Sequence, residues 1–167
     1  MHDKLTENDI KRLQEEIDYR KLVVREEAIQ AVKEAREHGD LSENFEYYAA
    51  KREKNKNESR IRYLERMIRT AQVISDDSKE DEVGMNNTVT LFFEDEGECE
   101  TYKIVTTIRE NSLEGRISNE SPIGRAIMGH KVGDRVYIKV NEQFGYYVEI
   151  RSISEAAGEE EDQIRKF

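Results

Sequence analysis

The chain has 167 residues, a formal net charge of −10 at pH 7, and 38% charged against 36% hydrophobic residues. This length allows one ordinary domain or two small ones, and the composition is too polar to fill one large core but too apolar for a disordered chain. The negative charge argues against a protein that wraps nucleic acid without specificity, because such binding needs many cations to neutralise phosphates.

The first predicted element is a long helix between about residue 6 and residue 39. Residues typical of a helix start precede Ile10, and Gly39 stands where a left-handed residue ends a helix. Apolar residues recur between them at heptad spacing, with one polar interruption at Arg20 or Lys21: Ile10, Leu13, Ile17, Val24, Ala28, Ala31 and Ala35. The pattern is typical of an imperfect two-stranded coiled-coil seam.

A second helix is predicted from about residues 41–44 to about residue 74. Its apolar positions follow 3-4-3 spacing: Ile61, Leu64, Ile68 and Ala71. Nearer the turn, three further residues are expected to face the alanines of the first helix: Tyr48, Asn55 and Ser59. The short connection allows only an antiparallel return, so residues 1–75 are predicted to form a hairpin with its tip at 39–44. With roughly 30 residues per helix, it would be about 45 Å long.

The periodicity changes to strand-like alternation after an acidic segment at residues 76–87, which we interpret as a linker. Five strands are expected at residues 88–93, 99–107, 115–118, 135–140 and 145–153. Between the third and fourth, Ser121, Pro122 and Gly129 supply the cap, first-turn proline and stop of one short helix. Residues 88–153 are thus predicted to form a small antiparallel sheet packed on a helix, with an acidic, frayed tail at 154–167, and the whole chain to be α+β.

Two carboxylates, Asp40 and Glu43, stand three residues apart at the predicted tip. The commoner use of this spacing is a helix cap, with Asp40 as the cap residue and Glu43 reaching back as in a capping box. The alternative is a metal ligand pair, since Mg²⁺ is commonly held by one or two carboxylates plus substrate oxygens and water. Both uses stay open on the local sequence.

The second helix is basic, with eight Lys or Arg against four Glu in residues 44–70. Such charge often serves only solubility and i,i+4 pairing. Arg36, Arg52 and Lys56 lie within a few turns of the tip, however, and we expect them to contact RNA. Tyr47 and Tyr48 are expected to brace the hairpin rather than to stack on a base.

Two long motifs resemble the Gre family of bacterial transcript cleavage factors. They are EAREHGDLSENFEYYAAKRE followed by ESRIRYLERMIRTAQVI, and ISNESPIGRAIMGHKVGD, and the resemblance spans about residues 6–153. It implies an N-terminal antiparallel coiled coil and a C-terminal domain with an FKBP-like fold. It also implies a transcription elongation factor that inserts its coiled coil into the secondary channel of bacterial RNA polymerase. There the factor would stimulate the polymerase's own cleavage of backtracked RNA and rescue arrested complexes.

The resemblance also implies roles by position. Asp40 and Glu43 match the tip acids that help to hold a second Mg²⁺, shared with the polymerase, and to orient the attacking water. Arg52 matches the family's basic patch for the RNA 3′ end. The free chain is expected to need no cofactor and not to be an enzyme by itself, because the polymerase carries out the Mg-dependent hydrolysis.

Ser121, Pro122 and Ile123 match the segment that engages the polymerase. The chain departs from the family pattern at the tip, where Ser42 is short and neutral and Phe45 replaces a smaller residue. Its acidic tail after residue 153 looks like an extension.

Two other functions are alternatives to transcript cleavage. A paralogue could occupy the same channel and inhibit transcription without stimulating cleavage, but the D-L-S-E spacing argues against it. Prolyl isomerase activity would need an aromatic pocket, whereas the aromatic residues of the second half fall at strand positions and are expected to fill the core. The single cysteine, Cys99, excludes an internal disulfide. The N-terminus lacks the apolar core of a signal peptide, so we expect a cytoplasmic protein with no membrane partner. A closed intramolecular hairpin leaves little need for a partner helix, so we expect a monomer.

Overall fold

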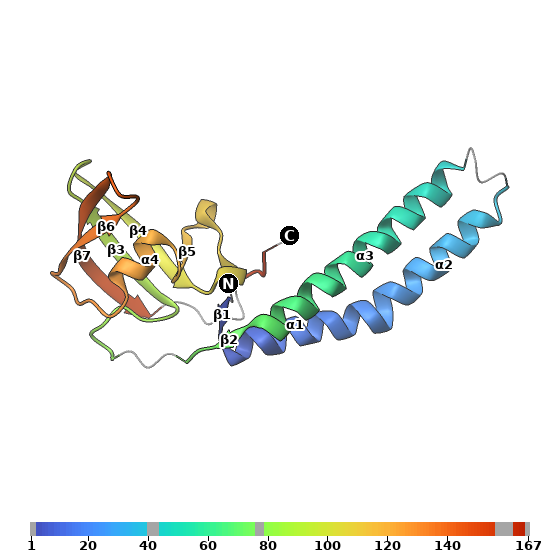
Figure 1. The fold of residues 1–167 in the computed structure, drawn as a ribbon, viewed down its shortest axis with the longest axis horizontal. Helices are drawn as coiled ribbons and strands as arrows, with labels where there is room; N and C mark the ends of the chain where they lie inside the picture. Colours follow the sequence, from blue (N-terminus) through green and yellow to red (C-terminus); the bar gives the residue numbers. More distant parts are fainter. Residues whose placement is uncertain (1–2, 40–43, 76–78, 156–161, 166–167) are drawn as a thin grey trace. The chain divides into compact units, whose positions relative to one another are not determined.

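The computed structural model describes residues 3–39, 44–75, 79–155 and 162–165, and these form two compact units (Figure 1). One unit, residues 8–71, is a helical hairpin, and the other contains a five-stranded sheet. The chain is therefore α+β, as predicted. No helix among the described residues is long and apolar enough to cross a membrane.

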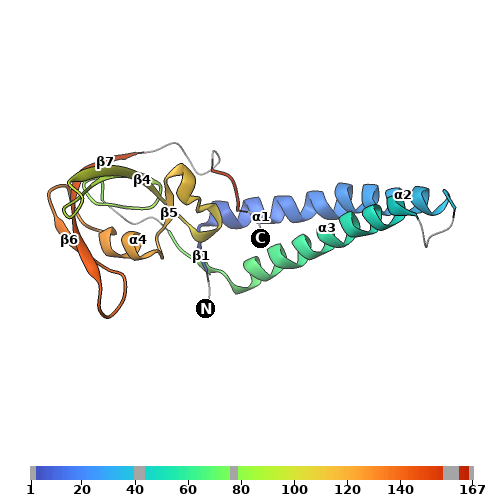
Figure 2. The ribbon, with the colours of Figure 1, turned by 90° about the horizontal axis from the view of Figure 1, so that it is seen from above.

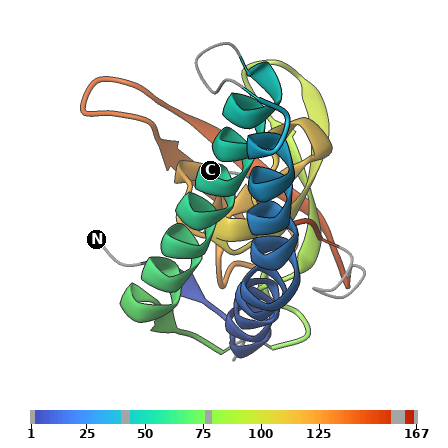
Figure 3. The same ribbon diagram turned by 90° about the vertical axis from the view of Figure 1, so that its right-hand side faces the viewer.

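The hairpin has a composite first arm and a single-helix second arm. The first arm runs through α1 (Glu7–Tyr19), the π-helical segment η1 (Arg20–Val24) and α2 (Arg25–Arg36), and the second arm is α3 (Phe45–Thr70). The two arms lie side by side and run antiparallel (Figures 2 and 3). The 26 residues of α3 span about 39 Å at ~1.5 Å per residue. The predicted antiparallel hairpin is confirmed.

The apolar seam is tightest at the end of the hairpin away from the turn. Leu13 and Ile17 of α1, with Ile61 and Leu64 of α3, are all at most 2% exposed. Burial of each such side chain contributes about 1.5–3 kcal/mol relative to exposure. This end therefore supplies much of the free energy that holds the two arms together.

A polar layer interrupts the seam at η1. The Arg20 guanidinium contacts Glu16 at 2.7 Å and donates to Asn57 Oδ1 at 3.0 Å, while Asn57 Nδ2 donates to the Arg20 carbonyl oxygen at 3.3 Å. Arg60 reaches the same Glu16 carboxylate at 2.9 Å. The sequence showed the interruption but not the π-helix that accompanies it.

From the end of η1 onward, the seam follows the prediction at Val24, Ala28 and Ala35 but not at Ala31. Ala31 is exposed, whereas Ala28 and Val32 are half-buried and Ala35 is buried. Val32, four residues after Ala28 and three before Ala35, takes the place at the seam that was predicted for Ala31. The prediction of Ala31 at the seam was therefore wrong.

The seam of α3 also differs from the prediction near the turn. Tyr47 and Asn57 are buried, whereas Tyr48 and Asn55, which were expected to face the first arm, are exposed. Counting back from Leu64 in helical steps of three and four residues reaches positions 61, 57, 54, 50 and 47. The residues of this series are all buried or half-buried, so they form the seam of α3 near the turn.

The sheet unit contains all five predicted strands and the predicted helix. The strands are β3 (Asn87–Phe93), β4 (Glu98–Val105), β5 (Arg116–Ser118), β6 (Arg135–Lys139) and β7 (Gly145–Glu155), in the order β5-β4-β3-β7-β6. The helix α4 (Pro122–Ile127) contacts β5 and β6. Aliphatic residues of the strands and α4 form a continuous buried core.

The sheet is mixed, not antiparallel as predicted. β5 runs parallel to β4, with Lys103 opposite Arg116 and Val105 opposite Ser118. The connection at residues 106–115 contains two 3-10 turns, η2 (Thr107–Arg109) and η3 (Ser112–Glu114), and carries the chain back along β4 before β5 begins. The sequence showed the two strands but not this return.

The boundary between the units also differs from the predicted one. Val83 and Met85 lie within the predicted linker at 76–87, yet they are 0% and 4% exposed and belong to the sheet core. At the other side, β1 (Lys4–Leu5) pairs in parallel with β2 (Gln72–Val73), and both belong to the sheet unit. Residues 3–6 and 72–75 are thus not part of the hairpin, because the pairing of β1 with β2 and the burial of Leu5 place them in the sheet unit.

The described part of the C-terminal tail is not frayed. Asp162 is 5% exposed, and the Arg165 backbone N–H donates to the Ile108 carbonyl oxygen at 2.6 Å. The acidic composition suggested a solvated tail, but this carboxylate meets buried cations of the sheet unit.

Candidate functional site at the hairpin turn and at α4

Asp40 and Glu43, the predicted tip acids, lie outside the described residues. The described residues on either side define the frame that carries them. This frame consists of the end of α2, the start of α3 and the side chains that join the two.

Asn44 joins both helix ends. Its Oδ1 accepts a hydrogen bond from the Tyr47 backbone N–H at 3.0 Å, which makes Asn44 the N-cap of α3. Its Nδ2 donates to the Ala35 carbonyl oxygen at 2.5 Å, in the last turn of α2. The capping role that the sequence suggested for Asp40 therefore belongs to Asn44, and that interpretation is corrected. Asn is as good a cap residue as Asp, so the signal was present in the sequence.

The end of α2 is shaped by backbone bonds and by glycine. Glu37 and His38 donate backbone hydrogen bonds of 3.2 Å to the carbonyl oxygens of the preceding turn. Gly39 has a φ of +120°, a conformation that favours glycine, as expected for the predicted helix end. The His38 ring contacts Glu46 at the start of α3 at 2.6 Å, which adds a second link across the turn.

Tyr47 packs between the arms at the turn and braces the hairpin, as predicted. It is 9% exposed, and the guanidinium of Arg36 and the ammonium of Lys51 lie 5.6 and 5.9 Å from its ring centre. A hydrogen bond from Arg36 lowers the pKa of the Tyr47 hydroxyl. Tyr48, in contrast, is 48% exposed.

The basic residues near the turn form two groups. Arg36 and Lys51 flank Tyr47. Arg52 and Lys56 are exposed one turn apart on α3, about 140–180° around the helix from Tyr47 at ~3.6 residues per turn. The structure therefore separates Arg36 from Arg52 and Lys56, and it places Lys51 beside Tyr47 with Arg36, which the sequence analysis did not predict. The i,i+4 spacing of Lys51 from Tyr47 was the available signal.

The predicted polymerase-binding segment begins α4 in the sheet unit. Ser121 Oγ accepts from the Gly124 N–H at 3.0 Å and donates to the Ser118 carbonyl oxygen at 2.6 Å. Pro122 is exposed, while Ile123 packs partly against the core. A Cβ on Gly124 would lie 2.0 Å from the Ser118 carbonyl oxygen, so α4 can pack this closely against the backbone at Ser118 only with glycine at this position. Of the three predicted residues, Pro122 is the one that a partner could reach most freely.

Comparisons with known proteins cover nearly the whole chain. Residues 4–73 match the family model "Transcription elongation factor, N-terminal", and residues 77–155 match "Transcription elongation factor, GreA/GreB, C-term". The transcription elongation factor GreA of Bacillus licheniformis is 44% identical over 136 residues, which cover 81% of this chain and 86% of that protein. GreA of Macrococcus caseolyticus is 41% identical over 150 residues, 90% and 95% of the two chains. Among solved structures, GreA factor homolog 1 (Gfh1) of Thermus thermophilus is 28% identical with a TM-score of 0.43, covering 92% of this chain and 99% of its own.

Proposed function

Because the chain belongs to the GreA/GreB family of transcription elongation factors, we propose that it acts on bacterial RNA polymerase by inserting its hairpin into the secondary channel. There it stimulates the polymerase's own cleavage of backtracked RNA and so rescues arrested complexes. The chain supplies positioned side chains, and the polymerase carries out the hydrolysis.

The observation that carries the proposal is the double hydrogen bond of Asn44. Asn44 caps α3 and also bonds to the last turn of α2, so the N-cap of α3 requires neither Asp40 nor Glu43. Asp40 and Glu43 are then available for a role other than capping. The further links His38–Glu46 and Arg36–Tyr47 support the same frame, so that a short turn can be presented on rigid helix ends.

The donor set of the turn fits a shared Mg²⁺ ion. Carboxylate oxygens are ligands that Mg²⁺ prefers, and its octahedral shell is usually completed by water and substrate oxygens. Among the described residues no group of three or more His, Cys, Asp or Glu is placed to hold a metal ion. Since two carboxylates alone fill only part of an octahedral shell, Asp40 and Glu43 would add oxygens to an ion that the polymerase also binds. A bound Mg²⁺ would stabilise negative charge on the reacting phosphate and lower the pKa of a coordinated water.

The chain's remaining roles follow from its exposed residues. Arg52 and Lys56 form an exposed cationic pair on α3 that suits contact with the phosphates of the RNA 3′ end, and Arg36 with Lys51 offers a second pair. The exposed Pro122, fixed by the Ser121 cap, serves as a contact with the polymerase.

The proposal is tested with purified polymerase halted on a backtracked transcript. Asp40→Asn and Glu43→Gln should each reduce stimulated cleavage at least ~100-fold, in the range reported for removal of one group that stabilises transition-state charge. Glu37→Gln, which removes an exposed acid directly before the turn, is the matched control and should cleave like the parent. Polymerase binding is measured by competition in parallel. Full cleavage by either tip variant at equal binding would disprove the proposal, as would suppression of intrinsic cleavage by the parent protein.

A further inference from the structure

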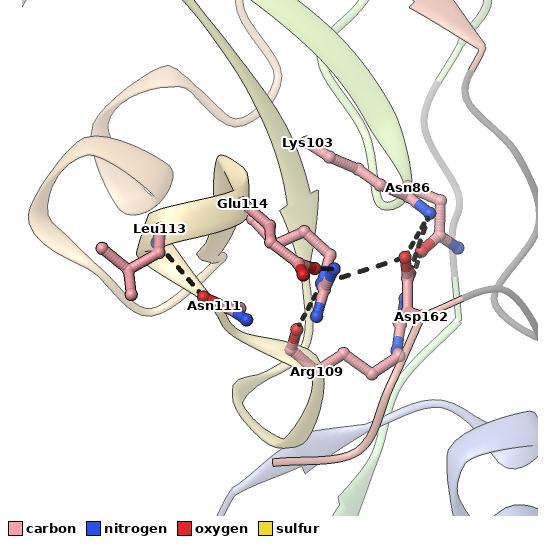
Figure 4. Close-up of polar contacts among 8 residues, drawn as sticks. Asn86, Lys103, Arg109, Asn111, Leu113, Glu114 and Asp162 are labelled. Carbon is pink, nitrogen blue, oxygen red and sulfur yellow. Dashed lines mark hydrogen bonds and ion pairs between the residues drawn. The ribbon is translucent and has the colours of Figure 1, made fainter.

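A buried cluster of charges lies in the sheet unit around Asp162 (Figure 4). The Lys103 ammonium donates to both carboxylate oxygens of Asp162, at 2.9 and 2.8 Å. Arg109 Nη1 donates to Oδ2 at 2.9 Å, and Arg116 Nε lies 3.9 Å from Oδ1. One carboxylate from the C-terminal segment thus faces three cations.

The three cations come from strands and a 3-10 turn of the sheet unit and are largely buried there. Lys103 is in β4, Arg109 in η2 and Arg116 in β5, and their side chains are only 12%, 0% and 11% exposed. Arg109 Nη1 also donates to Asn86 Oδ1 at 2.7 Å, and Arg116 Nε donates to the Arg109 carbonyl oxygen at 2.8 Å. These contacts orient the two arginines without using the tail.

Three cations buried this close together need a negative charge beside them. A guanidinium removed from water is costly unless a counter-charge and hydrogen-bond acceptors replace the water. Charge-assisted bonds from Lys and Arg to a carboxylate are among the stronger hydrogen bonds in proteins. Asp162 supplies this negative charge. It lies outside the segment that matches the family model, which ends at residue 155, whereas all three cations lie inside that segment.

The tail docks with its backbone as well as with its carboxylate. Three residues beyond Asp162, the Arg165 N–H donates to the Ile108 carbonyl oxygen at 2.6 Å. Ile108 directly precedes Arg109, so the two anchors bind the same stretch of η2. The segment is therefore seated like a bound peptide rather than held by one surface ion pair.

We propose that Lys103, Arg109 and Arg116 form an anion-binding site of the sheet unit, and that Asp162 is its built-in ligand. The site accepts a carboxylate in the native chain, and a small oxyanion such as phosphate can replace that carboxylate when it is removed. The C-terminal segment is thus a ligand bound in cis, and this inference does not depend on polymerase or on the hairpin.

The first experiment compares full-length Asp162→Ala with the parent by thermal unfolding at pH 7, in chloride and in phosphate at equal ionic strength. We expect Asp162→Ala to melt at least about 5 °C lower in chloride and to regain at least half of this loss in phosphate. Glu155→Ala removes an exposed acid at the end of β7 and is the matched control. The control and the parent should show no such difference between the two salts. A melting temperature of Asp162→Ala equal to that of the parent, or a loss that phosphate does not restore, would overturn the proposal.

The second experiment covers the case in which Asp162→Ala does not fold in chloride. Asp162→Asn keeps the shape of the side chain and removes its charge. Hydrogen exchange of the Arg165 amide should accelerate at least tenfold in this variant and remain at the parental rate in Glu155→Gln. An unchanged Arg165 exchange rate in Asp162→Asn would show that the charge of the ligand does not hold the segment, and the anion site would be rejected.

Discussion

Asn44→Ala tests the frame of the hairpin turn. The substitution removes the N-cap bond to Tyr47 and the bond to the Ala35 carbonyl oxygen. Loss of a good N-cap costs about 0.5–2 kcal/mol, and loss of one further hydrogen bond costs about 0.5–1.5 kcal/mol. The turn should therefore lose about 1–3.5 kcal/mol of local stability, whereas the apolar end of the hairpin, around Leu13 and Leu64, should be unaffected.

Hydrogen exchange by NMR measures this loss directly. In Asn44→Ala the amide of Tyr47 should exchange at least about fivefold faster, since ~1.4 kcal/mol corresponds to a factor of ten, while the amide of Leu64 keeps its rate. Asn44→Asp separates the two bonds, because Asp retains the cap acceptor but has no N–H to donate to Ala35. It should show an intermediate effect. If Asn44→Ala leaves the Tyr47 exchange rate unchanged, the structural argument about the turn is wrong.

Three further changes test the packing and the electrostatics. Burial alone would raise the pKa of Glu16, but hydrogen bonds from Arg60 and Arg20 outweigh burial and lower it below the ordinary 4.5. The ionised Glu16 carboxylate therefore stabilises the folded chain fully above about pH 4.5, and this contribution is lost as the pH falls through the lower pKa of the folded state. In urea unfolding, the difference in stability between the parent and Glu16→Gln should therefore shrink only at acidic pH. Gly124→Ala places a Cβ 2.0 Å from a carbonyl oxygen and should cost about 1–3 kcal/mol, seen as a lower melting temperature; an unchanged value would contradict the close contact. Leu64→Ala empties a 0%-exposed site and should cost about 2–5 kcal/mol in urea unfolding of the hairpin, and a cost below ~1 kcal/mol would contradict its core position.

The elements that the sequence predicted correctly are those with local signals. In β6, Val136 and Ile138 are buried while their neighbours are exposed, and this alternation is visible in the sequence. The cap and first-turn proline of α4 are adjacent residues, and Gly39 ends the first arm where a glycine was needed. Such features depend on a few neighbouring residues and on backbone geometry, so they can be predicted without the fold.

The features that the sequence did not predict depend on distant partners. Arg20 at the π-helical segment bonds to Asn57, 37 residues away, and Lys103 bonds to Asp162, 59 residues away. Neither pairing has a local pattern, so the π-helical segment and the position of the tail could be seen only in the folded structure. The candidate site lies between these cases. Its acids were predicted from their position at the turn, and the contacts of Asn44 show which residue caps α3, whereas the role of the acids as metal ligands stays a prediction.

The most direct test of the central claim is a Mg²⁺ titration of stimulated RNA cleavage, with the same polymerase complexes and saturating factor. If Asp40 and Glu43 add ligands to an ion shared with the polymerase, Asp40→Asn should require a several-fold higher Mg²⁺ concentration for half-maximal cleavage than the parent or Glu37→Gln. Identical half-maximal Mg²⁺ concentrations and identical maximal rates for all three proteins would contradict the account.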